Sequence, residues 1–122
     1  MMAAEWSKKQ RRELRDLQGI AWERELAAAL QVLRGDFDAW ERSEISAFDL
    51  SDRIHEYHNG KSRELFNRYS GSSNHFVILR AIASGVIAES ELSDELHECM
   101  SDDIVEVRKR WNSSSEDEVS VT

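Results

Sequence analysis

An apolar stripe that stays in helical phase constrains the fold of this chain more than any other feature of its sequence. Six residues form the stripe, at spacings of four, four, three, four and three positions: Trp22, Leu26, Leu30, Leu33, Phe37 and Trp40. At about 100° per residue these positions fall within roughly 80° of one another, which is the width of a buried helix face. The stripe therefore predicts one long helix whose apolar face is covered by shorter helices.

The composition of the chain also favours helices. Its 122 residues are enough for one hydrophobic core, and the sequence contains no proline, the strongest helix breaker. Gly35 lies inside the stripe, but the apolar phase continues across it, which favours an unbroken helix. We therefore predict an all-α fold, a compact bundle of four or five helices built around one long N-terminal helix from about Ala4 to Arg42.

The predicted N-terminal helix carries a second, lighter apolar face on the side opposite to the stripe. Its members are Leu14, Leu17, Ala21, Ala28 and Val32. A helix that is apolar on two sides is either central in its bundle or covered on one side by another subunit. Because small alanines allow close helix approach, we expect this face to contribute to a homodimer.

Capping residues mark the next two helices. Ser46 as N-cap, with Asp49 three positions later, predicts a helix start with a capping box. Asn59-Gly60 predicts the end of this helix, because both residues tolerate the left-handed conformation of a C-cap. A short third helix is expected from Ser62 to about Tyr69.

The C-terminal part of the chain predicts two more helices and a tail. Residues 76–87 are the most apolar segment and favour a buried helix that a glycine closes. The last helix should begin at Ser90 or Ser93. Its expected inner face comprises Leu92, Leu96, Met100, Ile104, Val107 and Trp111. Residues 112–122 are acidic and Ser-rich, so we predict a single helical domain over residues 1–111 followed by a disordered tail.

The net charge and the cysteine content exclude several classes of function. A net charge of −8 argues against a nucleic-acid binder, which needs a basic excess to neutralise phosphates. The single cysteine, Cys99, excludes an intramolecular disulfide and a cysteine-cluster zinc site, and we expect it to be buried or half-buried. No apolar run approaches the roughly 18 residues of a membrane span, and the charged N-terminal segment differs from a signal peptide. We therefore expect a cytoplasmic protein that binds no membrane.

The best candidates for chemistry gather in a polar segment of the second and third predicted helices. The residues expected to contact a ligand or a partner are Arg53, His55, His58, Asn59, Arg63 and Arg68. His55 and His58 are three positions apart, a spacing that lets two imidazoles reach one metal ion, with Asp52 as a third ligand. No other helix offers a complementary pair, so we predict no bound metal and no cofactor. The competing interpretation, which we prefer, places both histidines at the border of the core as packing and hydrogen-bonding residues.

Anion binding is a second interpretation of the same segment. Gly60-Lys61-Ser62 precedes a predicted helix N-terminus, where free amides attract phosphate. Arg63 and Arg68, however, differ by about 140° around a helix and do not easily face one ligand. Solvent-facing arginines paired with Glu56 and Glu64 are therefore the favoured interpretation.

Taken together, the sequence predicts a small cytosolic helical protein-interaction or regulatory module without catalysis. Its expected partner is itself, as a homodimer, or another protein. The alternative is a metal- or small-ligand-dependent enzyme or sensor that uses the segment around His55 and His58. A third alternative, an acidic mimic of nucleic acid, is disfavoured because acidic and basic residues alternate along the chain.

Overall fold

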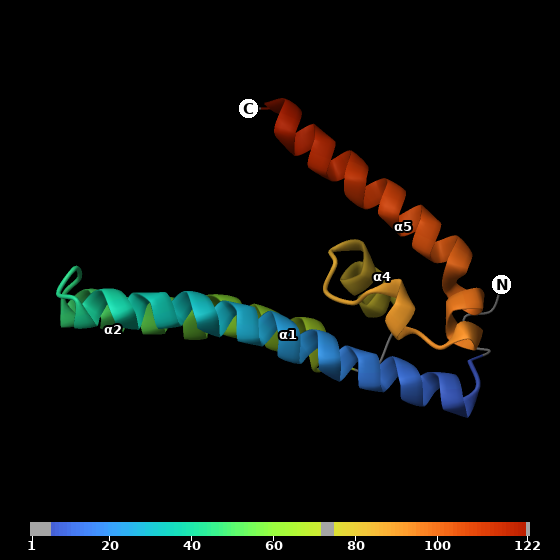
Figure 1. The fold of residues 1–122 in the computed structure, drawn as a ribbon, viewed down its shortest axis with the longest axis horizontal. Coiled ribbons are helices and arrows are strands. Elements are labelled where there is room, and N and C mark those ends of the chain that lie inside the picture. Colours follow the sequence, from blue (N-terminus) through green and yellow to red (C-terminus); the bar gives the residue numbers. More distant parts are fainter. Residues whose placement is uncertain (1–5, 72–74, 122) are drawn as a thin grey trace. The chain divides into compact units, whose positions relative to one another are not determined.

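The computed structural model describes residues 6–71 and 75–121, with side chains up to Ser114, and its regular structure is helical (Figure 1). In chain order the elements are α1 (Lys8–Glu41), α2 (Ala47–Glu56), the π-helix η2 (Tyr57–Ser62), α3 (Arg63–Tyr69), α4 (His75–Ala83), the 3₁₀-helix η3 (Glu89–Glu91) and α5 (Asp94–Val121). Within the described ranges there is no strand. The predicted all-α fold is therefore confirmed, as is the long N-terminal helix, which runs unbroken through Gly35.

Two compact units make up the chain. The first, which we call the hairpin, comprises Trp22–Ser72 and holds the second part of α1 with α2, η2 and α3. The second, which we call the terminal unit, comprises Met1–Ala21 and Ser73–Thr122 and holds the first part of α1 with α4, η3 and α5. The expectation that residues 1–111 form one domain stays a prediction.

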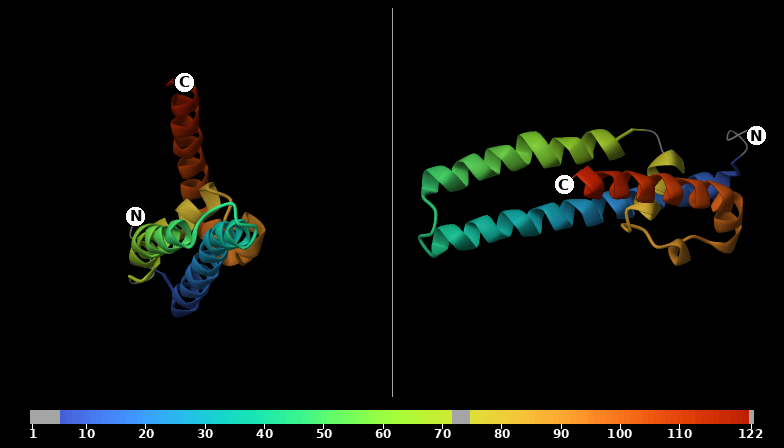
Figure 2. Two further views of the ribbon diagram at one scale, coloured as in Figure 1. Left: turned by 90° about the vertical axis from the view of Figure 1, so that its left-hand side faces the viewer. Right: turned by 90° about the horizontal axis from the view of Figure 1, so that it is seen from above.

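In the hairpin, α1 and the run from α2 to α3 lie side by side and antiparallel (Figure 2). α1 ends where Glu44 N–H donates to the Ala39 carbonyl at 2.8 Å and Ser43 N–H donates to the Trp40 carbonyl at 2.9 Å. This pair of bonds is a Schellman motif, and it places Ser43 in the left-handed region with φ of 61°. The motif reverses the chain within a few residues and so allows the second helix to return along the first.

α2 begins at the predicted capping box. The Ser46 hydroxyl accepts a hydrogen bond from Asp49 N–H at 3.0 Å, and the Asp49 carboxylate accepts one from Ser46 N–H at 3.1 Å. Donation from the Ser46 backbone also holds the pKa of Asp49 below its ordinary value. The predicted N-cap is confirmed.

The predicted helix end at Asn59-Gly60 is wrong, because both residues lie inside η2, which joins α2 directly to α3. A π-helical turn, here called a π-turn, contains one residue more than an α-helical turn. The side chains that follow it are therefore rotated back by about 100° around the helix axis. Leu50, Leu65 and Tyr69 are buried, at 6%, 0% and 3% exposure. Without the π-turn, Leu65 and Tyr69 would be out of phase with Leu50, so the π-turn keeps one apolar face across the whole run.

The stripe from Trp22 to Trp40 is not the main buried face of α1, contrary to the prediction. Leu30, Phe37 and Trp40 are 45%, 39% and 42% exposed, and the other three members are half-buried. Inside the hairpin only the run from α2 to α3 packs along this part of α1, and one neighbour covers about half the width of such a stripe. The buried residues of α1 are instead Gln10, Leu14, Leu17, Gln18 and Ala21.

The predicted homodimer face of α1 also needs correction. Leu14, Leu17 and Ala21 are at most 4% exposed within the chain itself, so they are not available to a second subunit. The other two members of that face, Ala28 and Val32, are exposed, Val32 at 72%. The lighter face is therefore split between buried and exposed parts.

The terminal unit holds a well-packed core between α4 and α5. Leu92, Leu96, Met100 and Ile104 are buried as predicted, with Leu96 and Met100 completely enclosed. Further along the predicted inner face burial falls off: Val107 is half-buried and Trp111 is 36% exposed. The core residues that α4 and the following loop contribute are Ile78, Leu79, Ala81, Ile82 and Ile87.

Local capping sets both ends of this core. Gly85 has φ of 85°, and the bonds from Gly85 N–H to the Ile82 carbonyl (3.1 Å) and from Val86 N–H to the Ala81 carbonyl (2.8 Å) form a Schellman motif that closes α4 as predicted. Ser93 caps α5 through a hydrogen bond from Leu96 N–H to its hydroxyl at 3.1 Å. Both are local signals, which explains why the sequence reveals them.

The assigned bounds of α5 extend into the segment for which composition predicts a disordered tail, because the helix includes residues 112–121. Propagation of an anchored helix adds one hydrogen bond per residue and needs no new nucleus. Packing on α4 therefore supports helix beyond the last packed residue. Thr122 and the side chains from residue 115 onward lie outside the described residues.

Candidate interaction surface

Ion pairs join the two helical arms along one side of the hairpin, which we call the charged side. Arg53 on α2 contacts Asp36 on α1 at 2.6 Å, and Arg68 on α3 contacts Glu25 on α1 at 3.1 Å. Arg68 also binds Glu64 at 2.8 Å within its own helix. These five charged side chains therefore pair with one another within the chain.

A buried tyrosine reinforces the charged side. The Tyr69 hydroxyl donates a hydrogen bond to the Glu25 carboxylate, and the Trp22 ring stacks on the Tyr69 ring with centroids 6.3 Å apart. Burial, followed by the interaction with Glu25, raises the pKa of Tyr69 to about 12. A tyrosine with a raised pKa stays a neutral hydrogen-bond donor, which suits a structural role and not that of a base.

The opposite side of the hairpin, which we call the apolar side, carries Leu30, Phe37, Ile54 and Phe66. Phe37 follows Asp36 in α1, and Ile54 follows Arg53 in α2. Each step along a helix rotates the side-chain direction by about 100°, so these two apolar residues lie on the other side of the contact between the two helices. Leu30 shares this side because it lies seven positions before Phe37, and Phe66 lies two positions before Arg68. The four side chains are 45%, 39%, 38% and 56% exposed.

Exposed charges of both signs border the apolar side; we call them the rim. They are Glu23, Arg34, Glu41 and Arg63, each three, four or seven positions from an apolar-side residue in its own helix. In the part of the chain that the structure describes, these four side chains form no ion pair, unlike Asp36, Glu25, Arg53 and Arg68. Two acids and two bases make the rim neutral overall, although the whole chain carries a charge of −8.

The structure separates the six residues that the sequence singled out. Arg53 and Arg68 belong to the charged side and hold structural ion pairs. His55, His58, Asn59 and Arg63 are exposed, so the two histidines are not half-buried at the core border. The six residues therefore do not line one common pocket: two join the helices, Arg63 belongs to the rim, and His58 lies four positions after Ile54, beside the apolar side.

The same segment shows no built metal site. Across the described residues no group of three or more His, Cys, Asp or Glu side chains is arranged to hold a metal ion.

Glu64, predicted to pair with the arginines, binds Arg68 and lies 3.8 Å from Lys61. The predicted pairing of Glu64 with solvent-facing arginines therefore holds for Arg68, which is itself partly buried.

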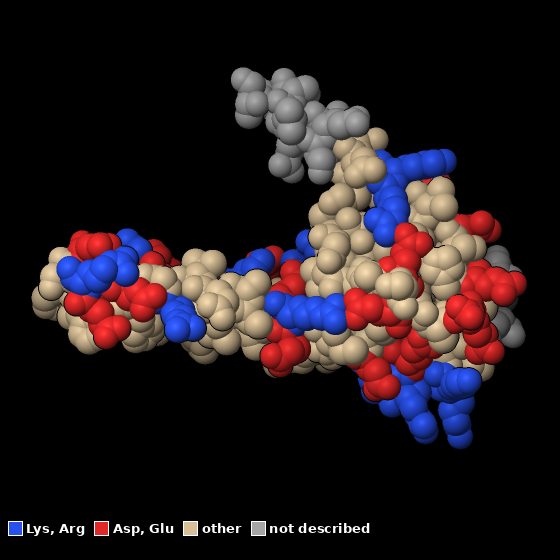
Figure 3. Space-filling view, viewed as in Figure 1, with Lys and Arg blue, Asp and Glu red and all other residues tan. Residues whose placement is uncertain are grey.

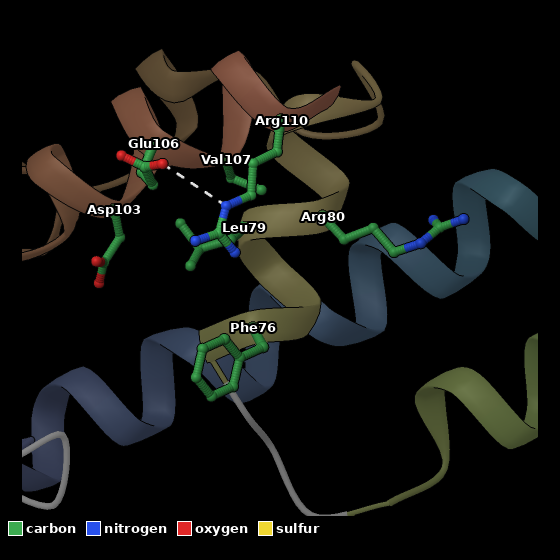
Figure 4. A pocket seen from close by; sticks show the side chains of 7 residues that line it. All are labelled: Phe76, Leu79, Arg80, Asp103, Glu106, Val107 and Arg110. Atoms are coloured by element: carbon green, nitrogen blue, oxygen red, sulfur yellow. Dashed lines mark ion pairs between the residues drawn. The ribbon is translucent and has the colours of Figure 1, made fainter. Parts of the chain in front are cut away.

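The terminal unit contains a shallow pocket of about 290 Å³ between α4 and α5 (Figure 4). Phe76, Leu79, Arg80, Asp103, Glu106, Val107 and Arg110 line it. Figure 4 shows Arg80 extending away from the other side chains, and its guanidinium lies 5.4 Å from the centre of the Trp111 ring. Glu106 and Arg110 lie 3.6 Å apart. The lining therefore balances two acids with two bases and contains no hydroxyl or thiol side chain.

A second charged cluster stabilises the terminal unit. Glu89 on η3 accepts hydrogen bonds from His97 at 2.9 Å and from Arg108 at 2.5 Å, both on α5. Hydrogen bonding by His97, then by Arg108, holds the pKa of Glu89 below its ordinary value. The Glu13 carboxylate similarly accepts hydrogen bonds from the Ser93 N–H and hydroxyl, both at 2.7 Å. These bonds fix η3 and the start of α5.

Cys99 is exposed, contrary to the prediction that it is buried or half-buried. Its Sγ accepts a hydrogen bond from Gln10 Nε2 at 3.2 Å, which joins α5 to α1 inside the terminal unit. The pattern of α5 explains the error, since Leu96 and Met100 occupy the buried positions on either side and Cys99 falls just off that face.

No protein-family model, curated protein or solved structure matches this chain. Among the described residues, none of the helices combines the length and the apolar character that crossing a membrane requires. Evidence about function therefore comes from the surface itself.

Proposed function

We propose that this protein is a small helical protein-interaction or regulatory module without catalysis, and that the apolar side of the hairpin is its binding surface. The observation that carries the proposal is the grouping of Leu30, Phe37, Ile54 and Phe66 on one side, each at least 38% exposed. Contiguous exposed apolar residues bordered by polar ones are typical of protein-binding sites, and aromatic residues dominate the binding energy of such sites.

Chemistry and charge support a protein as the partner. Tyr69, whose pKa is raised to about 12, is a buried structural donor. On the face seen in Figure 3, acidic and basic side chains are interspersed, which does not favour a polyanion such as nucleic acid. The partner in this proposal is a second copy of the chain or another protein, and the compartment is the cytoplasm, where an exposed thiol such as Cys99 stays reduced.

The experiment compares three immobilised proteins in an extract of the cells that make this protein. Phe37→Glu places a charge on the apolar side, and Val32→Glu places the same charge at a site 72% exposed, four positions before Asp36 and so on the charged side. We expect wild type and Val32→Glu to retain a common set of proteins that Phe37→Glu loses, as quantified by mass spectrometry. Circular dichroism should show equal helix content in all three.

An apolar side without a binding role would give a different result. The set of retained proteins would then be the same for Phe37→Glu as for wild type, or no protein, including the chain itself, would be retained by any of the three. Either outcome contradicts the proposed function.

A further inference from the structure

Within the described part of the hairpin, no second layer of helices covers the apolar side. Two helices packed against each other bury the residues between them, and here Leu50, Leu65 and Tyr69 are buried in this way. Leu30, Phe37 and Ile54 lie beside that line and remain 38–45% exposed. Helical folds close such a face with a second layer, most simply another pair of helices. What covers the apolar side should therefore match a flat, two-helix face.

The rim indicates which molecule provides the second layer. In a two-fold symmetric contact a surface meets its own copy, so each charge on its edge faces charges from the same set. A rim of one sign would repel its copy, whereas Glu23, Arg34, Glu41 and Arg63 sum to zero. None of the four has an ion-pair partner in the described part of its own chain. The rim therefore suits a copy of itself, in which acids of one subunit can lie opposite bases of the other.

The charged side offers no comparable surface. Its ion pairs, from Arg53 to Asp36 and from Arg68 to Glu25, already join the two helical arms of the hairpin. A partner on that side would have to desolvate satisfied pairs, which costs free energy without supplying new ones. Among the described residues the rim charges are unpaired whereas Arg53 and Arg68 pair with α1, and four large apolar side chains are exposed on the apolar side against Val32 on the charged side, which favours the apolar side.

We infer that two copies of this chain associate through the apolar sides of their hairpins to form a four-helix assembly. Leu30, Phe37, Ile54 and Phe66 form the centre of the contact, and the rim supplies its outer ion pairs. This inference rests on the proposed function and names the partner of the same surface. It also replaces the homodimer face predicted from Leu14, Leu17 and Ala21, which are buried within each chain.

Sedimentation equilibrium of the purified full chain tests the inference. Wild type should be a dimer at micromolar concentrations, and its mass should fall toward the 14.1 kDa of the monomer on dilution. Phe37→Glu and, separately, Leu30→Glu should weaken association by at least about tenfold, because each buries an unpaired carboxylate at the contact. Val32→Glu should dimerise like wild type. Circular dichroism identifies any variant that fails to fold, and the two apolar-side variants make the test independent of either one.

Three outcomes would overturn the inference. A wild-type chain that stays monomeric at high concentration means that no second copy binds. A dimer that persists in both Phe37→Glu and Leu30→Glu means that another surface joins the chains. A dimer lost in Val32→Glu alone places the contact on the opposite side of α1. In the first case the proposed function is still judged separately, by whether Phe37→Glu loses proteins that the wild type retains from an extract.

Discussion

Tyr69 and Glu25 show how single residues hold the hairpin together. They lie on different helices, yet the tyrosine hydroxyl donates to the carboxylate while Arg68 neutralises its charge at 3.1 Å. The neutral tyrosine is the form that the fold favours, because ionisation would place a second negative charge beside Glu25 in a buried position. The pKa of Tyr69 is accordingly raised from its ordinary value of 10.0 to about 12.

This pKa predicts how stability changes in alkaline solution. Because the folded-state pKa lies above the unfolded one, the contribution of Tyr69 is fully present below pH 10.0 and is lost as the pH rises through about 12. In a Tyr57→Phe background, which leaves Tyr69 as the only tyrosine, the ultraviolet absorbance of tyrosinate should therefore appear with a midpoint near 12. Glu25→Gln should lower that midpoint, since burial alone then raises the pKa. A midpoint at the ordinary value in the folded chain would contradict the burial of this hydroxyl.

Residues that act locally were predictable from the sequence, and residues that act across the hairpin were not. The capping box of Ser46 and Asp49 spans three positions, so its pattern is visible in the chain. Arg68 and Glu25 are 43 positions apart, and nothing in either segment indicates the other. For the same reason Arg53 and Arg68 looked like free ligand-binding groups, although each is held by a carboxylate on α1.

At the scale of elements, glycine shows why one helix end was predicted correctly and another was not. Gly85 closes α4 with a positive φ of 85°, as its position after an apolar run indicates. Gly60 follows an asparagine in the same kind of context, but it lies within η2. The need to keep Leu65 and Tyr69 in phase with Leu50 outweighs the local preference of Asn59-Gly60 for a helix end. That need comes from packing against α1, which no local pattern contains.

Alanine at these two glycines should therefore have opposite effects on stability. Gly60→Ala should raise the free energy of unfolding by about 0.5–1 kcal/mol, because the backbone is helical there and an added Cβ meets nothing within 4 Å beyond its chain neighbours and the adjacent backbone of its own helix. Gly85→Ala should lower it by about 1 kcal/mol or more, because a left-handed φ strains any residue with a Cβ. Urea denaturation of both variants measures the two changes. A loss of stability in Gly60→Ala would indicate a left-handed helix end at this position.

For the molecule as a whole, the periodicity of α1 revealed which residues share a face but not how many neighbours cover that face. The stripe from Trp22 to Trp40 is real as a helical pattern, and its members are half-buried or partly exposed. How far a helix face is buried depends on how many helices pack against it. Among the hairpin residues that the structure describes, only the run from α2 to α3 packs against this face, and it does so from one side. The error in the predicted dimer face has the same cause. A sequence pattern identifies apolar faces but does not tell whether each face packs inside the chain or against another chain.

Two leucine substitutions distinguish the internal core from the proposed contact between chains. Leu96 is fully buried in the terminal unit, so Leu96→Ala should cost about 2–5 kcal/mol of unfolding free energy at any protein concentration. Leu30 is 45% exposed in the single chain, so in dilute solution Leu30→Ala should cost less than about 1 kcal/mol. Association stabilises the folded chain by mass action, so the cost of Leu30→Ala should grow as the concentration rises into the range where dimers form. Denaturation curves recorded over a hundredfold range of concentration test this difference. If the two variants show the same concentration dependence, Leu30 does not take part in a contact between chains. If Leu30→Ala costs as much free energy as Leu96→Ala in dilute solution, the stripe is covered within one chain.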